Sequence, residues 1–373
     1  FRGYRICILI KKEMIKYRIL FLSVFISTLF SSCAQERILP YFSCTPTLVE
    51  PYGITSHIGR KTADYEVMDE QLDLMNEIGI NWVRADFDWR QNKTVTNHYA
   101  AYNEFMMDSV LIKTQRAGIK LLPILSTFDR DINYAWDDFE NYQTYVNYIL
   151  HRYGYGVSHI EVMNEVNLIK NSEGNYSVPQ NAAHYNNVLP RISNIIRFSN
   201  TDTKVVIGGL GRLDDDFLER IVEKDAPSYI DIMNFHCYEM PEKFAKSFSK
   251  LKKSMETNNW NKHVWLTETG YSVDQDSVNI RKSRTAEDQA KYIARAYLVS
   301  FAYGIDKVFL YNLKDWKDTP YQRGANYGIL YYNMKPRLGL QALKTLIKMC
   351  PDGSTRPDLV IDGSIYHSSW ERP

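Results

Sequence analysis

The chain has 373 residues, which is enough for one large domain or two ordinary ones. Its 45 Lys and Arg residues nearly balance its 44 Asp and Glu residues. This balance excludes the broad basic surface typical of proteins that bind nucleic acid or anionic lipid, so we expect no nucleic-acid partner.

The N-terminal region resembles a leader. Residues 1–13 precede the first methionine, Met14, and we interpret them as upstream sequence. A basic start then leads into an apolar run over residues 19–30, which is too short to span a bilayer but typical of a secretory signal. We therefore expect residues 1–35 to be upstream sequence and leader, and the protein to be exported.

Small residues precede Cys33, and this junction resembles a bacterial lipoprotein signal, although Phe30 stands where such signals usually carry leucine. On this interpretation Cys33 is acylated and tethers the protein to a cell-surface or periplasmic membrane face. Ordinary cleavage near Ala34 is the alternative. The chain has five cysteines without CxxC spacing, so the sequence supports neither a disulfide framework nor a zinc site.

Eight short apolar segments have the length and composition of buried strands. They are residues 53–58, 81–85, 120–125, 159–163, 204–208, 230–235, 263–267 and 307–311.

Eight amphipathic segments lie between and after these strands, with apolar residues at helical spacing. They are residues 67–78, 104–117, 136–153, 182–198, 215–223, 242–257, 286–303 and 336–349. Several of them end at a glycine directly before the next strand, as at Gly79, Gly118 and Gly304, where a glycine favours the end of a helix.

This alternation predicts an α/β fold, a single (β/α)8 TIM barrel over residues 36–350. A doubly wound open sheet is the main alternative. It would normally carry a glycine-rich phosphate loop after its first strand, which the residues after Gly53 do not form. The run Gly208-Gly209-Leu210-Gly211 is better interpreted as a tight turn. The tail, residues 351–373, contains one strand-like piece that either begins an accessory β-domain or packs on the barrel.

Two predicted strands end in a glutamate. Met163-Asn164-Glu165 closes the fourth strand and Leu266-Thr267-Glu268 closes the seventh. Since catalytic residues of such barrels lie at the C-terminal strand ends, the two carboxylates are suited to cleaving a glycosidic bond, and the amide of Asn164 could hold a sugar hydroxyl. The alternative is that Glu165 is a strand residue held in an ion pair.

Other polar residues follow other strands. The candidate substrate-binding residues are His57, Arg84, His236, Tyr238 and Trp316, and His57 could equally be a structural histidine. The eight histidines are scattered without metal-ligand spacing, so we expect neither a metal nor a cofactor.

The arrangement resembles clan A glycoside hydrolases over most of the chain, roughly from Pro51 to Lys348. In that clan the acid/base follows an asparagine at the end of strand four, as in Asn164-Glu165, and the nucleophile ends strand seven, as does Glu268. Family 39 and family 5 members both fit.

Three further positions carry the resemblance. Val83-Arg84 is similar to the clan's arginine that supports the nucleophile. Phe235-His236-Cys237-Tyr238 is similar to its strand-six His/Tyr pair, in which the aromatic hydroxyl contacts the nucleophile. Trp316 lies beyond strand eight, where relatives place a stacking tryptophan, but it comes five residues after Tyr311, which departs from the pattern.

The resemblance implies a retaining double displacement on a polysaccharide or oligosaccharide. Glu268 would attack the anomeric carbon while Glu165 protonates the departing oxygen. A non-catalytic glycan-binding barrel lipoprotein is one alternative. A phosphate-using aldolase or isomerase is another, although the residues after strands seven and eight form poor phosphate loops. Sugar, linkage, exo or endo action and oligomeric state depend on features that residue types do not determine.

Overall fold

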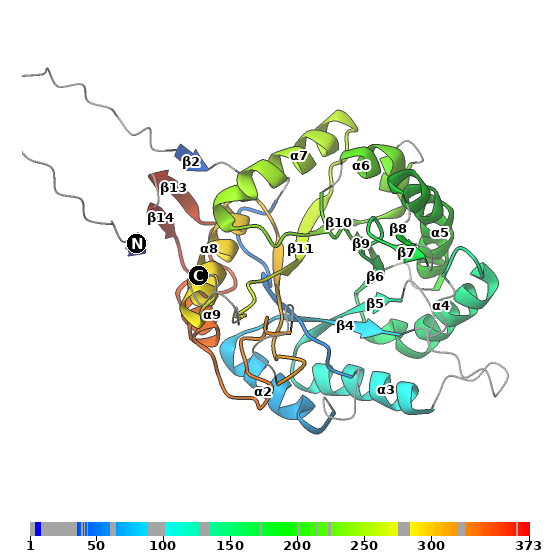
Figure 1. Cartoon of the computed structure of the whole chain (residues 1–373), viewed down its shortest axis with the longest axis horizontal. Coiled ribbons are helices and arrows are strands. Elements are labelled where there is room, and N and C mark those ends of the chain that lie inside the picture. The colour runs from blue at the N-terminus through cyan, green and yellow to red at the C-terminus, as the bar shows by residue number, and fades with distance from the viewer. Residues whose placement is uncertain are drawn as a thin grey trace, which may run out of the picture.

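The computed structural model describes residues 4–8, 36–38, 40, 42, 44–59, 65–88, 101–126, 134–171, 174–175, 177–199, 202–213, 215–222, 225–274, 284–318, 325–362 and 365–373. Within these residues, eight parallel strands close into a barrel in the order β10-β11-β12-β3-β4-β5-β6-β9. Helices surround the barrel as an outer ring (Figure 1). The predicted (β/α)8 barrel is confirmed.

The barrel strands are β3 (Tyr52–Thr55), β4 (Trp82–Phe87), β5 (Lys120–Leu125), β6 (His159–Asn164), β9 (Lys204–Gly209), β10 (Ile232–His236), β11 (His263–Thr269) and β12 (Lys307–Tyr311). The helices of the described part are α2 (Met68–Ile78), α3 (Ala101–Arg116), α4 (Phe139–Tyr153), α5 (Val178–Ser199), α6 (Asp215–Val222), α7 (Phe244–Thr257), α8 (Ala286–Ala302) and α9 (Leu338–Met349). Short 3₁₀ turns are η1 (Gly154–Gly156), η2 (Ala226–Tyr229) and η3 (Pro241–Lys243).

Local sequence signals explain most of these boundaries. Gly79, Gly118 and Gly304 have φ values of 88°, 69° and 94°, the left-handed conformation that ends a helix and that glycine adopts without steric cost. The start of α5 differs from the prediction because the helix begins at Val178, four residues earlier than expected. A proline in the first turn is compatible with a helix, so Pro179 does not delay the start.

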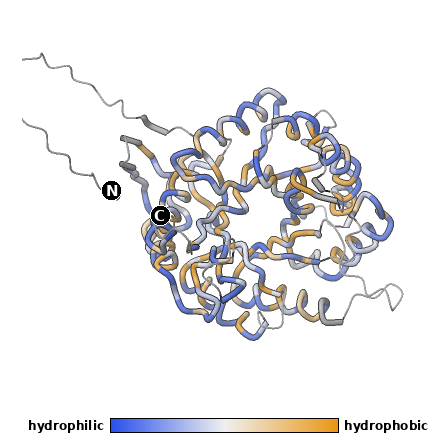
Figure 2. The backbone as a smooth tube through the Cα atoms, in the orientation of Figure 1, coloured by the Kyte–Doolittle hydropathy of each residue, from blue (hydrophilic) through white to orange (hydrophobic). Residues whose placement is uncertain are grey.

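The helices are amphipathic, and their apolar faces pack on the outside of the barrel to form the main core. Hydrophobic and hydrophilic residues alternate along the outer helices in Figure 2. None of the helices within the described residues is long and apolar enough to cross a bilayer.

The barrel interior has an apolar end and a polar end. Side chains of a strand alternate between its two faces, so Trp82, Arg84 and Asp86 of β4 share one face. Six apolar side chains from six strands form a separate buried cluster at the N-terminal end, namely Trp82, Leu122, Val206, Ile232, Trp265 and Phe309. This layer closes one end, and the ionisable side chains collect above it at the C-terminal strand ends.

The C-terminal tail forms two strands where one strand-like piece was predicted. β13 (Asp358–Asp362) and β14 (Ile365–Trp370) pair antiparallel, with β2 (Glu36–Ile38) beside β13 and β1 (Tyr4–Ile8) beside β14. The indole Nε1 of Trp370 donates to the carbonyl of Met349 at 2.7 Å, which attaches the hairpin to the end of α9. The rest of the predicted leader, with Cys33, lies outside the described residues.

A buried ion pair offers a test of the fold. Arg337 donates through Nη1 and Nη2 to the two oxygens of Asp315 at 2.7 and 2.6 Å, and both side chains are buried. We expect Asp315→Asn to lower the free energy of unfolding by about 3–5 kcal/mol, since it leaves a buried guanidinium uncompensated. Asp216→Asn, which removes the exposed partner of Arg220, should cost less than about 1 kcal/mol. Urea denaturation of both variants checks this, and equal losses would contradict the expectation.

Candidate active site

Arg84 is the centre of the polar network at the C-terminal end of the barrel. Its guanidinium is buried and donates from Nε and Nη2 to Glu161 at 2.6 and 2.8 Å. Nη2 also donates to Oδ1 of Asn164 at 2.6 Å, and Nη1 donates to Oε1 of Glu268 at 2.7 Å. This one cation on β4 therefore holds two carboxylates and an amide from two other strands, β6 and β11, in fixed positions.

Glu268 is held as a carboxylate. Tyr238 donates its hydroxyl to Oε2 at 2.5 Å, while Arg84 occupies Oε1. Burial works against the charged form, but His236, Arg84 and Tyr238 together outweigh it and lower the pKa of Glu268 below its usual range. The whole residue is 8% exposed, so its carboxylate is ionised yet shielded from most solvent.

Irregular pairing at the strand ends directs the side chain of Glu268 into the site. Strict alternation along β11 would place Thr267 and Glu268 on opposite faces. The register shifts between Phe235 and His236 on β10, however, so that His236 pairs with Glu268. The side chain of Glu268 thereby reaches Arg84 from the barrel mouth.

The end of β6 is also irregular. Met163 and Glu165 adopt φ values of 73° and 47°, which are uncommon for residues with side chains and indicate local strain. As a result Met163 is buried in the main core while Asn164 bonds Arg84 and Glu165 reaches the site. Such strain persists where the surrounding structure compensates for it, as at many active sites.

His236 lies between the two glutamates. Its Nδ1 is 3.2 Å from Oε1 of Glu165 and 3.6 Å from Oε2 of Glu268, so this nitrogen faces both carboxylates. One oxygen of Glu165, one ring nitrogen of His236 and one oxygen of Glu268 all lie within 4.8 Å of one another. A Cβ on Gly209, which lies at the end of β9 and not in the predicted turn, would be 2.3 Å from Nε2 of His236, so this glycine leaves the space that the imidazole fills.

The two glutamates differ in exposure. The side chain of Glu165 is 38% exposed, whereas that of Glu268 is 10% exposed. Two carboxyl groups about 5–5.5 Å apart are typical of retaining glycosidases, and about 6.5–9.5 Å of inverting ones. One oxygen of Glu165 lies within 4.8 Å of one oxygen of Glu268, which fits the former geometry better than the latter.

A second group of aromatic side chains borders this network. His57 contacts Asp86 through Nδ1 at 3.2 Å and the hydroxyl of Tyr311 through Nε2 at 3.0 Å. The ring of Tyr311 lies 6.2 Å from that of Tyr238 and 5.4 Å from that of Tyr327, between ring centroids. His57 is thus linked to Glu268 through aromatic neighbours.

The remaining candidate, Trp316, follows β12. The ammonium of Lys317 lies over the ring of Trp316, 4.5 Å from the ring centroid. At the end of β12 the residue in the expected aromatic position is Tyr311. After β6, the short strands β7 (Lys170–Asn171) and β8 (Gly174–Asn175) pair antiparallel.

Sequence reasoning missed four residues of the site. Glu161 was seen as part of a strand only, although its position four residues before Glu165 was a usable signal. Asp86, near the end of β4, and Tyr311, at the end of β12, were given no role. Tyr327 comes from the connection between β12 and α9, where no pattern indicates a function.

Glu165, His236 and Glu268 form the group among the described residues that could hold a metal ion. Both oxygens of Glu268 already accept from Arg84 and Tyr238, and the nearby guanidinium repels a cation. These donors suit a carboxylate that reacts with an electrophile better than one that binds a metal.

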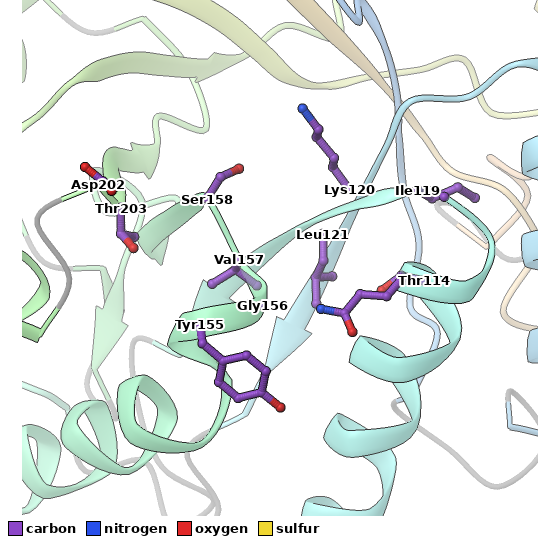
Figure 3. A pocket seen from close by; sticks show the side chains of 12 residues that line it. Thr114, Ile119, Lys120, Leu121, Tyr155, Gly156, Val157, Ser158, Asp202 and Thr203 are labelled. Carbon is purple, nitrogen blue, oxygen red and sulfur yellow. The ribbon is translucent and has the colours of Figure 1, made fainter.

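A cavity of about 500 Å³ lies at the other end of the barrel. It is lined by the start of β5, the turn that contains Tyr155 and the residues before β9 (Figure 3). None of the network residues lines it. We therefore place the reaction at the C-terminal strand ends.

The hydroxyl of Tyr238 gives a testable effect on pH dependence. Tyr238→Phe removes a hydrogen bond that favours the charged form of Glu268, so the pKa of Glu268 should rise. On the assumption that Glu268 must be ionised in the free enzyme, the acid limb of the kcat/KM profile should move to higher pH, by roughly one unit. A profile with an unmoved acid limb would show that this hydrogen bond does not control Glu268.

Solved structures share this fold. The chain is similar to a family 39 glycoside hydrolase from the gut symbiont Bacteroides cellulosilyticus WH2, with a TM-score of 0.67, 18% identity, and coverage of 87% of this chain and 68% of that chain. It is also similar to a glucosidase from Croceicoccus marinus (TM-score 0.64, 14% identity, 87% and 72% covered). A family 5 mannosidase from Rhizomucor miehei gives a TM-score of 0.59 at 13% identity, with 81% and 94% covered.

At these identities the similarity establishes the fold alone. No curated protein matches the chain. A family model described as the glycosyl hydrolase catalytic core matches residues 78–303, which is more than half of the chain and includes Arg84, both strand-end glutamates and the His236–Tyr238 segment. The chain therefore belongs to the glycosyl hydrolase catalytic core family.

Proposed function

We propose that this glycoside hydrolase cleaves O-glycosidic bonds with retention of anomeric configuration, using Glu268 as nucleophile and Glu165 as acid/base. The observation that carries the proposal is the close approach of the two carboxylates from the ends of β6 and β11, with one oxygen of each within 4.8 Å of the other. A separation this short leaves too little room for a water molecule to attack between them, as inversion requires.

In the first step an oxygen of Glu268 would attack the anomeric carbon, and the bond to the leaving oxygen would break. Glu165, the more exposed of the two, would give its proton to that oxygen. In the second step Glu165 would take a proton from water, whose oxygen would attack the same carbon and release Glu268 as a carboxylate. The pair carries one negative charge throughout, and the proton that leaves with the first product is replaced by one from water.

Three neighbours would support these roles. Arg84 and Tyr238 keep Glu268 ionised before attack and stabilise the carboxylate that leaves in the second step. The amide of Asn164 is oriented by its bond to Arg84 and stands beside the acid/base. The rings of Tyr238, Tyr311 and Tyr327 offer flat apolar faces and hydroxyl groups at the border of the site, which suits a sugar.

The proposed substrate is a polysaccharide or an oligosaccharide derived from one. A non-catalytic glycan-binding role is the second candidate, but it gives no reason to keep a buried, ionised Glu268 so close to Glu165, since binding alone does not require paired carboxylates.

A substrate screen tests the proposal. We expect the protein to release the chromophore from at least one aryl glycoside, and reducing ends from at least one polysaccharide. Glu239→Ala removes an exposed carboxyl group next to Tyr238 and should keep wild-type activity. It is the matched control for the loss of a carboxyl group in Glu268→Ala. Saturable glycan binding without any bond cleavage would favour the non-catalytic role.

We propose further that the protein is exported and anchored through Cys33. The support is the order of basic, apolar and small residues that ends at this cysteine. Expression in a bacterial host should yield a membrane-associated product with acyl groups on Cys33 by mass spectrometry. Cys33→Ala should release it, and a wild-type product without acyl groups would contradict the proposal.

A further inference from the structure

Glu161 is the one carboxylate of the network to which the catalytic scheme gives no role. It lies on β6, four residues before Glu165, and its side chain is fully buried. Its oxygens accept from Nε and Nη2 of Arg84, and Oε1 also accepts from the backbone N–H of Gly209 at 3.0 Å. A buried carboxylate with this many donors is well compensated. If the pair of Glu161 and Arg84 served the fold alone, however, Arg84 would not need to bond Glu268 as well.

The guanidinium of Arg84 has five N–H donors. Four of them donate hydrogen bonds to Glu161, Asn164 and Glu268. Glu161 takes the edge formed by Nε and Nη2 in a two-point contact, which fixes the plane of the guanidinium. The orientation that results directs Nη1 to Glu268 and the other hydrogen of Nη2 to Asn164. Glu161 therefore determines where Arg84 meets the two residues that face the substrate.

The charge of Glu161 also matters. The single positive charge of Arg84 is shared between two carboxylates. Burial alone would lower the pKa of Arg84, but Glu161, and to a smaller extent Glu268, raise it. If Arg84 faced Glu268 alone, its whole charge would stabilise the Glu268 carboxylate. A carboxylate stabilised in that way is a weaker nucleophile and forms the glycosyl–enzyme ester more slowly.

We propose that Glu161 is a positioning residue that orients Arg84 and limits how strongly Arg84 stabilises the carboxylate of Glu268. This inference rests on the proposed function, in which Glu268 is the nucleophile. Its effect on the ionisation of Glu268 can nevertheless be measured without any turnover.

The test is Glu161→Gln, which keeps the shape of the side chain and removes its charge. The negative charge that opposed ionisation of Glu268 is lost, so the pKa of Glu268 falls and the acid limb of kcat/KM should move to lower pH, by about one unit. This is opposite to the direction expected for Tyr238→Phe. We expect kcat at the plateau to fall by roughly 10-fold, because the nucleophile is less basic.

The same shift is measured directly by NMR. In protein labelled with ¹³C at glutamate carboxyl groups, the Glu268 signal is assigned by its absence in Glu268→Gln, and its titration midpoint should be lower in Glu161→Gln. If wild type cleaves no glycoside but this midpoint falls, the proposed function fails and the role of Glu161 stands. If wild type is active and the midpoint of Glu161→Gln is unchanged or higher, only the role of Glu161 fails.

Two further variants separate positioning from stability. Asp306 precedes β12 at the other end of the barrel, and its largely buried carboxylate accepts from Arg356. Asp306→Asn should therefore lower stability without moving the acid limb of kcat/KM. Glu161→Asp keeps the charge and shortens the side chain, so it should lower kcat while the acid limb stays within a few tenths of a unit. If Glu161→Gln does not fold, wild-type kinetics in Glu161→Asp would overturn the proposal.

Discussion

Glu268→Ala is expected to lower kcat by about 10⁴-fold or more, the scale of loss when an enzyme loses its nucleophile. No other described side chain stands where its carboxylate meets Arg84 and Tyr238. The variant should nevertheless fold, because Arg84 keeps its two-point contact with Glu161 and is not left as an unpaired buried charge. Initial rates on an activated aryl glycoside, together with thermal unfolding, measure both effects.

Azide provides the control for this variant. The space left by the carboxylate admits a small anion, which should attack the anomeric carbon directly and restore turnover. The product would be a glycosyl azide with inverted configuration, because only one displacement takes place. Full activity of Glu268→Ala without azide would remove Glu268 from the role of nucleophile.

Glu165→Ala should have a smaller and substrate-dependent effect. Loss of a general acid/base costs about 10²–10⁴-fold, and the cost depends on how much help the leaving group needs. Glycosides of acidic phenols should still transfer their sugar to Glu268, after which the ester accumulates because no base activates water. We expect an initial burst of phenol followed by a slow steady rate, measured by stopped-flow absorbance.

The same anion distinguishes the two glutamates. With Glu165→Ala, azide needs no general base and should release the sugar from Glu268 as a glycosyl azide of retained configuration. The opposite configurations from the two variants would assign the two roles independently of any rate. If both variants gave the same anomer, the roles assigned here would be wrong.

The barrel itself was predictable because its strands are short apolar runs that alternate with amphipathic helices. Two of the eight strands, β5 and β12, have the predicted bounds. The two glutamates could be located because each ends such a run, and parallel strands of a barrel bring their C-terminal ends to one side. Their approach to within 4.8 Å also depends on the irregular ends of β6 and β11, which direct both side chains into the site.

The contacts within the site were less predictable. Strand periodicity places Arg84 inside the barrel but does not tell which carboxylate it meets, and Glu161 was missed for that reason. The position of His236 between the glutamates depends on the register shift after Phe235, which no residue pattern signals. Trp316 was chosen as a tryptophan beyond strand eight, whereas Tyr311 and Tyr327 supply the aromatic rings beside Tyr238.

The stereochemistry of the first product tests the central claim most directly. Proton NMR of the anomeric region, recorded during the first minutes of hydrolysis before mutarotation, shows which anomer the enzyme releases. The paired carboxylates predict that the sugar appears in the configuration it had in the substrate. Release of the opposite anomer would mean that water attacks in a single displacement, and Glu268 could not be the nucleophile.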